Sequence, residues 1–196
     1  MMTQDTHVRI DNRLLHGQVV QFWIPSLGVR RLVIADAVTA ADLALVSLYR
    51  MVMPKDVTLE VVAPAALGQT LATGDASSTL VLLGSIADAM TARQSGFAFA
   101  QLTIGNVHAA GGRSRVTDSV HLSEQELRSL LELKGAGATV SIQSFPGEQF
   151  RLELDPKDDI GMIGRELLKF RGAGALGDDC VEIDGLRDGD PPPAER

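Results

Sequence analysis

The chain has 196 residues, of which 45% are hydrophobic and 22% are charged, the balance of an ordinary soluble globular protein. Its 25 acidic and 18 basic residues leave a formal net charge of −7, which argues against non-specific binding to nucleic acid or to an anionic membrane. The single cysteine, Cys180, excludes an internal disulfide and a cysteine-rich zinc site. The N-terminal residues lack the apolar segment of a signal peptide, and no stretch is apolar enough to span a membrane. We therefore expect a cytoplasmic protein that acts at a membrane only as a peripheral partner.

Apolar, β-branched runs alternate with helical patterns along the chain. In chain order we expect a strand at 7–11, a helix at 17–27, a strand at 31–36, a helix at 40–53, a strand at 57–63, a helix at 64–72, a strand at 79–84, a helix at 85–94, strands at 101–106 and 116–122, a helix at 123–135 and a strand at 139–144. Pro64 opens one helix, Ser85 is a candidate N-cap, and Ser123 with Glu126 forms a capping box.

Strict alternation of strands and helices predicts an α/β fold. The continuous apolar strands indicate a single-domain, open, mainly parallel twisted sheet with helices on both faces. Such sheets place their sites beyond the carboxyl ends of the strands. Three places of that kind contain polar residues, at 11–17, at Asp36 and at 105–115.

The length favours one domain, at residues 1–157, followed by an extension at 158–196. Within that extension, residues 172–196 contain seven acids, two arginines, five glycines and three consecutive prolines. We expect these last 25 residues to be a mobile tail, because they offer little apolar surface to offset the entropy of ordering. An alternative for residues 180–183 is a small edge strand.

The densest group of chemically active side chains is the segment RIDNRLLHGQVVQFW, residues 9–23. A strand ends at Asp11, and a helix begins near Gly17, whose free backbone N–H groups favour an anion. Arg13 offers a planar set of donors to phosphate oxygens, and Asp11 is placed to fix the tautomer of His16. Together these residues suit a covalent phosphohistidine site, with Gly17 allowing close approach of the added group.

Plainer interpretations of the same residues exist. A histidine in a loop is usually a surface residue, and Asp11 with Arg13 also suits a local ion pair of little energetic value. No phosphate-binding loop of the nucleotide-binding type is present. The remaining histidines lack the spacing of metal ligands, so we expect neither a metal nor a cofactor. These histidines are His7, His108 and His121.

The segment at 9–23 closely resembles the RIDDRLIHGQVxxxW signature of the IIB component of the mannose/fructose/sorbose family of the phosphoenolpyruvate-dependent sugar phosphotransferase system (PTS). The resemblance continues in LVIADAVTAADL and in LTIGNVHAAGGRSRVTDSVHLSEQELRSLLELKGAGATVSIQSFPGE, residues 102–148, and it covers about residues 7–155. The family fold is an open α/β sheet, in agreement with the strand and helix pattern.

The resemblance implies a protein-N(π)-phosphohistidine–sugar phosphotransferase, a phosphocarrier of PTS uptake. His16 matches the histidine that accepts a phosphoryl group from the phosphohistidine of a IIA protein, and Nδ1 is the expected nitrogen. Arg13 matches the signature arginine and is expected to clamp the phosphate or the transition state, while Asp11 is expected to orient the loop or His16. The phosphoryl group then passes to a sugar held by the membrane IIC and IID components.

Further residues are expected to border this site. Asn12 stands where the family usually has a second acid, and Asn12 and Gly17 belong to the predicted phosphate-binding loop. Asp36 is a candidate at the edge of the site, although helix capping fits it as well. Residues of the second loop are expected to border the site or dock a partner, namely Asn106, His108, Arg113 and Arg115.

Two other functions compete with the phosphocarrier. One is a regulatory module that is phosphorylated on His16 without transporting a sugar, and the other is a binding module in which His16 is inert. The resemblance favours the phosphocarrier, whereas the acidic tail slightly favours the regulatory module. The sequence does not indicate which sugar is transported, and a homodimer is compatible with it.

Overall fold

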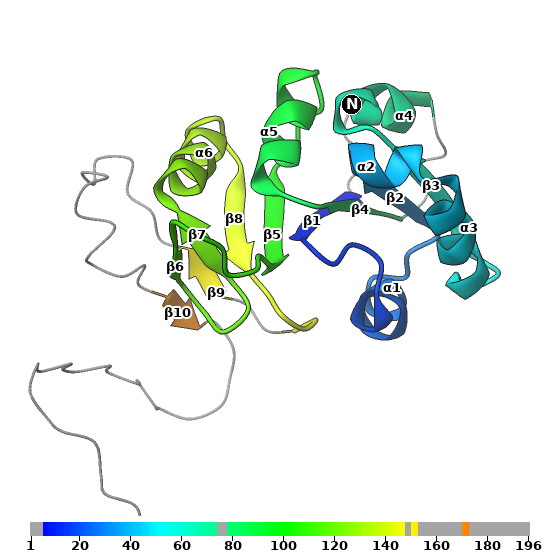
Figure 1. Ribbon diagram of the computed structural model, residues 1–196, viewed down its shortest axis with the longest axis horizontal. Coiled ribbons are helices and arrows are strands. Elements are labelled where there is room, and N and C mark those ends of the chain that lie inside the picture. Colours follow the sequence, from blue (N-terminus) through cyan, green and yellow to red (C-terminus); the bar gives the residue numbers. More distant parts are fainter. Residues whose placement is uncertain (1–5, 74–77, 148–149, 153–169, 173–196) are drawn as a thin grey trace, which may run out of the picture.

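The computed structural model describes residues 6–73, 78–147, 150–152 and 170–172. An eight-stranded sheet with the order β10-β9-β8-β5-β1-β4-β2-β3 forms its centre (Figure 1). The strands are β1 (Thr6–Asp11), β2 (Arg31–Ala35), β3 (Thr58–Val62), β4 (Thr79–Leu83), β5 (Gln101–Asn106), β8 (Thr139–Ile142), β9 (Phe150–Leu152) and β10 (Phe170–Gly172). Six of these strands are parallel to one another, and β9 pairs antiparallel with both β8 and β10. The predicted open, mainly parallel α/β sheet is confirmed.

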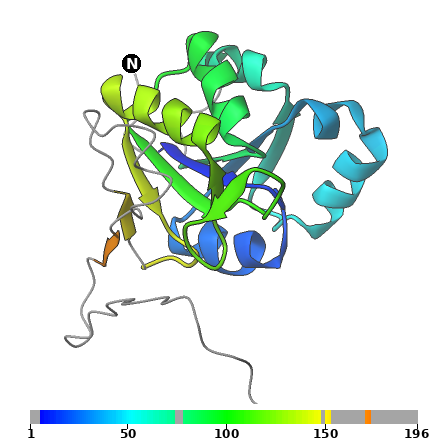
Figure 2. The ribbon, with the colours of Figure 1, turned by 60° about the vertical axis from the view of Figure 1, so that its left-hand side comes forward.

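Helices cover both faces of this sheet (Figures 1 and 2). They are the π-helix η1 (Val19–Trp23), α1 (Ile24–Ser26), α2 (Ala37–Ala41), α3 (Leu43–Val52), the 3₁₀-helix η2 (Pro64–Ala66), α4 (Leu67–Thr73), α5 (Ile86–Gln94) and α6 (Glu124–Gly135). A separate two-stranded ribbon, β6 (Arg113–Arg115) and β7 (His121–Ser123), lies between β5 and α6 along the chain. Among the described residues, none of these helices has the length and apolar character needed to cross a bilayer.

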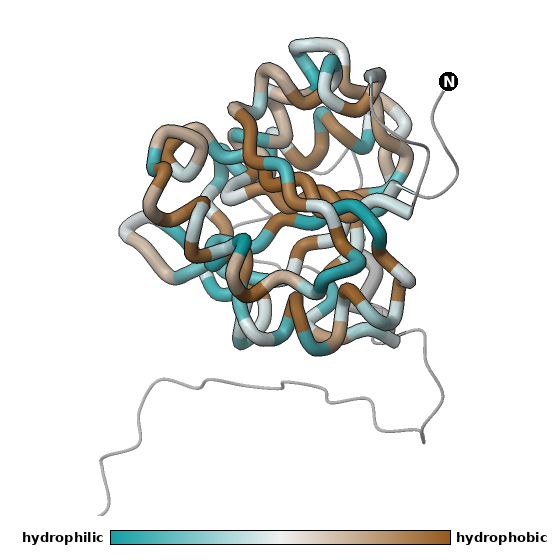
Figure 3. Tube along the Cα trace, turned by 90° about the vertical axis from the view of Figure 1, so that its right-hand side faces the viewer, coloured by the Kyte–Doolittle hydropathy of each residue, from teal (hydrophilic) through white to brown (hydrophobic). Residues whose placement is uncertain are grey.

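Alternate residues of the strands feed two apolar clusters, one on each face of the sheet. The larger cluster joins strand residues such as Ile10 and Ile104 to α5 and α6, and the smaller one joins Leu32 and Leu82 to η1 and α1. Figure 3 shows the hydrophobic segments gathered in the centre of the fold. Burial on both faces explains why the strands are continuously apolar in sequence.

Local capping residues act as the sequence predicts. The Ser85 side chain accepts a hydrogen bond from the Asp88 backbone N–H at the start of α5. Ser123 and Glu126 form the reciprocal capping box of α6. Because each cap satisfies otherwise unpaired N–H groups, the beginnings of these helices are fixed by short-range chemistry.

Two predicted elements are wrong in their bounds. The single helix expected at 40–53 is divided into α2 and α3, because Asp42 has non-helical backbone angles and its side chain caps α3 by accepting from the Leu45 N–H. The strand expected at 116–122 is instead a turn that leads into β7, because Thr117 Oγ1 accepts from the Val120 N–H and turns the chain. In the helix expected at 17–27, Val19 and Trp23 are buried, and residues 19–23 have π-helical bonding.

The extension predicted from residue 158 contributes one described segment. Residues 170–172 form β10, which pairs with β9 at the edge of the sheet. Most of the predicted mobile tail, and the alternative strand at 180–183, lie outside the described residues. The boundary at 157 therefore stays a prediction.

The strand order creates a switch point at β1. The helical segment after β1 packs on one face of the sheet, whereas α6, which follows β5, packs on the other. The two strands are neighbours, and Asp11 lies opposite Asn106. The loops after β1 and β5 therefore leave the sheet side by side, which is the position where open α/β sheets place their sites.

Candidate active site at the carboxyl end of β1

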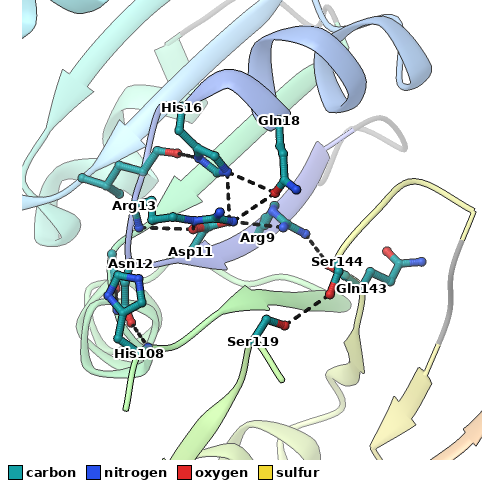
Figure 4. A network of polar contacts seen from close by, with 12 residues as sticks. Arg9, Asp11, Asn12, Arg13, His16, Gln18, His108, Ser119, Gln143 and Ser144 are labelled. Atoms are coloured by element: carbon teal, nitrogen blue, oxygen red, sulfur yellow. Dashed lines mark hydrogen bonds and ion pairs between the residues drawn. The ribbon is translucent and has the colours of Figure 1, made fainter. Parts of the chain in front are cut away.

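A buried carboxylate is the centre of the candidate site (Figure 4). Asp11, the last residue of β1, has no exposed surface. Its Oδ1 accepts from the backbone N–H and the Nε of Arg13, each at 3.1 Å. Its Oδ2 accepts from Arg9 Nη2 and Arg13 Nη2, each at 3.2 Å. Two guanidinium groups thus share one carboxylate, which leaves a local surplus of one positive charge.

Arg9 is buried even though it carries a charge. Its guanidinium lies 4.2 Å from the centre of the Trp23 ring and donates from Nη1 to the Gln143 carbonyl oxygen at 2.8 Å. Burial lowers the pKa of Arg9 to about 10, while the neighbouring Asp11 acts in the opposite direction. Arg9 is still protonated at neutral pH, so it is a permanent partner for the Asp11 carboxylate.

The space occupied by the Arg9 guanidinium depends on Gly105 in β5. A Cβ atom at position 105 would lie 1.8 Å from Arg9 Nη2 and 2.1 Å from Arg9 Cζ. No side chain fits at that distance, so glycine is required here for close approach to the arginine. Residues 96 positions apart in sequence therefore build the same charge network.

His16 lies beside this network with its ring partly exposed. Its Nδ1 is 2.9 Å from the Leu14 carbonyl oxygen, and its Nε2 is 3.9 Å from Asp11 Oδ2. Leu14 has a φ of 52°, a left-handed conformation that is uncommon for residues other than glycine. This backbone conformation lies next to the histidine in the loop, and such strain is concentrated at functional sites.

Gln18 connects the arginine to the histidine. Its Oε1 accepts from Arg13 Nη2 at 3.1 Å and lies 3.4 Å from His16 Nε2. Gln18 directly precedes the π-helix η1, a form of helix that is rare and often found at functional sites. The same helical segment carries Trp23, which covers Arg9.

Asn12 joins the first loop to two other segments. Its Nδ2 donates to the Gly84 carbonyl oxygen at 2.5 Å, and its Oδ1 accepts from the His108 N–H at 2.6 Å. An ionised aspartate accepts hydrogen bonds but donates none, so it could not make the Gly84 contact. The amide at this position therefore suits the particular contacts of this chain, where the family usually has an acid.

The second predicted loop is held by contacts within the chain. Arg113 forms two hydrogen bonds with the Glu126 carboxylate, at 2.6 and 3.0 Å, and donates from Nη1 to the His108 carbonyl oxygen at 2.8 Å. Burial of Glu126 acts to raise its pKa, but the hydrogen bonds from Arg113 and Ser123 outweigh it and lower the pKa. Arg115 pairs with Asp118 at the exposed end of the ribbon. Both predicted docking arginines therefore have acidic partners of their own.

The remaining predicted residues have distinct positions. Asp36 caps α2 by accepting from the Thr39 N–H at 2.7 Å, which is the capping role considered for it, and it lies beside Gly84. The backbone carbonyl of Asn106 accepts from the Asn12 N–H, while the Asn106 Oδ1 is buried without a hydrogen-bond partner among the described residues. A Cβ atom at Gly17 would meet open space, so the packing of the chain does not itself require glycine there.

The sequence analysis assigned no role to two residues whose side chains contact Asp11, Arg13 or His16. These are Arg9 and Gln18, both within the 9–23 segment. An arginine inside a strand is normally read as exposed, and the placement of Arg9 depends on Trp23 and Gly105. Within the described ranges, no group of three or more His, Cys, Asp or Glu side chains is arranged to hold a metal ion.

Comparison with known proteins gives a matching family model. The model of a family described as the PTS system sorbose subfamily IIB component matches residues 6–155. This range contains every residue of the site built above. It also agrees with the extent of the resemblance found in the sequence.

Individual relatives are similar over most of their length. The N-acetylgalactosamine-specific phosphotransferase enzyme IIB component 2 of Escherichia coli is 26% identical, over 71% of this chain and 90% of the relative. The sorbose-specific EIIB component of Klebsiella pneumoniae is 27% identical, over 71% of this chain and 87% of the relative. The crystal structure of manxB from Thermoanaerobacter tengcongensis matches with a TM-score of 0.68 and 27% identity, over 81% of this chain and 94% of that one.

Proposed function

Because the chain belongs to the sorbose subfamily of PTS IIB components, we propose that it carries a phosphoryl group on His16. The group arrives from the phosphohistidine of a IIA protein and leaves to a sugar held by IIC and IID membrane components. The observation that supports this most strongly is the position of His16, beside a buried carboxylate that two arginines share. The family takes part in sugar phosphotransfer in the PTS. The roles of His16, Arg13 and Asp11 in that transfer are our proposal.

The transfer is a displacement at phosphorus. The lone pair of a neutral His16 nitrogen attacks the phosphoryl group, the bond from phosphorus to the donor nitrogen breaks, and the donor imidazole keeps the electron pair. In the second step a sugar hydroxyl attacks the phosphoryl group on His16 and releases its proton to solvent. The bond from phosphorus to the His16 nitrogen breaks, its electron pair stays on that nitrogen, and His16, still protonated on its other nitrogen, leaves as a neutral imidazole. Catalysis here depends on alignment and on stabilising the charge of the equatorial oxygens.

Arg13 is the side chain best placed to stabilise that charge. It is about one-third exposed, whereas Asp11 and Arg9 are buried. Because Arg9 already neutralises Asp11, the positive charge of Arg13 is the local surplus available to a phosphate. A guanidinium presents several donors in one plane, so Arg13 can bind phosphate oxygens while keeping contact with Asp11.

The expected nucleophile, Nδ1, lies against the Leu14 carbonyl in this arrangement. For Nδ1 to attack, the proton must reside on Nε2, which faces the oxygens of Gln18 and Asp11. The lone pair of Nδ1 and the Leu14 oxygen would then repel each other. We propose that the imidazole turns away from Leu14 when the donor binds, with Gln18 and Asp11 stabilising the proton on Nε2.

The second loop contributes to the site through Asn12. The His108 N–H donates to Asn12, and the His108 carbonyl accepts from Arg113. These two hydrogen bonds fix the second loop beside the loop that carries His16. We propose that this edge contacts the partners during transfer. The open space at Gly17 gives a phosphoryl group room to approach the loop.

The relatives are named for N-acetylgalactosamine and for sorbose, so the family includes more than one specificity. The regulatory alternative uses the same His16 and differs only in the second step. Release of the phosphate to a sugar in the presence of permease membranes separates the two functions.

The experiment that tests the proposal is transfer from a phosphorylated IIA protein of the source organism, followed by intact-mass measurement. The wild-type chain should gain one phosphate, and His16→Ala should gain none. His7→Ala is the matched control, because His7 lies in β1 away from the carboxyl end and should accept phosphate normally. An undiminished phosphate gain by His16→Ala would contradict the proposed site.

A further inference from the structure

Among the residues that the structure describes, the large apolar side chains that remain exposed form two groups. Five belong to α2 and α3, namely Val38, Leu43, Leu48, Met51 and Val52. The other two are Phe22, which is 46% exposed, and Phe145, which is 40% exposed. The second group is the smaller one, but its position relates it to the proposed transfer site.

Phe22 and Phe145 come from different parts of the chain and pack on each other. Their ring centres are 5.9 Å apart at an angle of 73°, an edge-to-face contact. Phe22 belongs to η1, and Phe145 belongs to the loop that follows β8. An aromatic pair of this geometry is favourable in itself, and its outer surface is still available to a partner.

The aromatic pair is connected to the His16 network on both sides. Phe22 lies about one helical turn after Gln18, whose side chain contacts both His16 and Arg13. The loop of Phe145 begins at Gln143, whose carbonyl accepts from Arg9. That loop is also tied to the segment after β5, because the hydroxyls of Ser119 and Ser144 lie 3.2 Å apart (Figure 4).

We infer that Phe22 and Phe145 form the docking surface for the IIA protein that delivers the phosphoryl group to His16. The inference rests on the proposed function and adds the surface that the donor contacts. Transfer between two histidines requires their nitrogens to approach one phosphorus atom, so the donor protein must cover the surface around His16. The exposed rings come from the two segments that supply Gln18 and Gln143 to the His16 network, so a donor that covers His16 can reach them, and Arg13 supplies a positive charge for the phosphate.

The size of the patch suits a complex that forms and separates quickly. The donor must leave before a sugar can reach the same imidazole, so a large permanent interface would block the second step. Small interfaces are typical of such transient encounters, and aromatic residues commonly carry most of their binding energy. Two rings held against each other present a rigid apolar surface that loses little entropy on binding.

The test compares two phosphoryl donors. Phosphorylated IIA protein of the source organism needs a docking surface, whereas phosphoramidate is small and needs none. In Phe22→Ala and Phe145→Ala we expect the KM for phosphorylated IIA to rise about tenfold or more, with kcat changed far less. The rate of labelling by phosphoramidate should be the same as in the wild-type chain.

Met51→Ala is the matched control, because Met51 is also an exposed apolar side chain but belongs to α3. Its KM for phosphorylated IIA should not change. The inference is contradicted if both Phe variants keep the wild-type KM, if phosphoramidate labelling slows as much as transfer from IIA, or if only release to the sugar is impaired. Wild-type chain that accepts no phosphate from either donor would instead contradict the proposed function, and the docking surface with it.

Discussion

The segments that follow β1 and β5 both contain arginines, but they use them differently. In the first loop, Arg13 shares the buried carboxylate of Asp11 with Arg9, so one positive charge is in excess. In the second loop, Arg113 and Arg115 each have an acidic partner, Glu126 and Asp118. The number of arginines in a loop therefore does not by itself give the positive charge that is available to a phosphate. That charge depends on how many of the arginines are already neutralised by an acidic partner.

The largest expected effect comes from displacing Arg9, the buried partner of Asp11. In Gly105→Ala the new methyl group collides with the buried Arg9 guanidinium, which must then move from its place beside Asp11. Breaking a buried charge pair costs about 3–5 kcal/mol, so the melting temperature should fall by more than about 6 °C. Gly135→Ala, where a Cβ meets open space in α6, is the control and should not lower it. An unchanged melting temperature in Gly105→Ala would show that Arg9 is not confined.

Removing the surplus charge itself should affect transfer more than stability. Arg13→Ala should slow phosphoryl transfer from phosphorylated IIA by about 10²-fold, the usual effect of losing one transition-state donor. The melting temperature should change little by comparison, because Arg9 still neutralises Asp11. Single-turnover rates measure the first effect and thermal unfolding the second. Transfer at the wild-type rate would remove Arg13 from the mechanism and end the contrast between the two loops.

The connection between the two loops can be weakened through Asn12. Asn12→Asp keeps an acceptor for the His108 N–H but loses the donor to the Gly84 carbonyl. We expect a loss of about 1–3 kcal/mol in the free energy of unfolding, because a carboxylate then faces a carbonyl oxygen. Chemical denaturation at neutral pH measures it. Equal or higher stability in Asn12→Asp would show that the amide is not selected by these contacts.

The smallest expected effect concerns the second loop and depends on pH. The folded state lowers the pKa of Glu126 below its ordinary value of 4.5, so ionised Glu126 stabilises the fold above pH 4.5 and that contribution disappears as the pH falls through the folded pKa. Glu126→Gln should lower the melting temperature by about 2–4 °C at pH 7 and by less at pH 3. A difference that is the same at both pH values would contradict an electrostatic role for the Arg113–Glu126 pair.

Local sequence patterns predicted much of the fold. The apolar strands predicted the parallel sheet, and the caps at Ser85 and Ser123 were predicted to the residue because capping depends on neighbours three positions away. The division of the 40–53 helix was missed because Asp42 suits a helix surface and a helix cap equally well. Propensity alone does not decide between the two.

The site was predictable in position but not in its internal contacts. The 9–23 segment, at the end of a strand, indicated where the site lies. The burial of Arg9 was not predictable, because it depends on Trp23, Gly105 and Gln143 in three other elements or loops. The pairing of Arg113 with Glu126 likewise depends on tertiary structure, so the sequence did not predict it, and a docking role for this loop stays a prediction.

The most direct test of the central claim is to locate the phosphoryl group on the wild-type chain. The chain is labelled by phosphorylated IIA, digested at alkaline pH to preserve phosphohistidine, and its fragments are sequenced by mass spectrometry. The account predicts one phosphate, on His16. Phosphate on His7, His108 or His121 with none on His16 would contradict it.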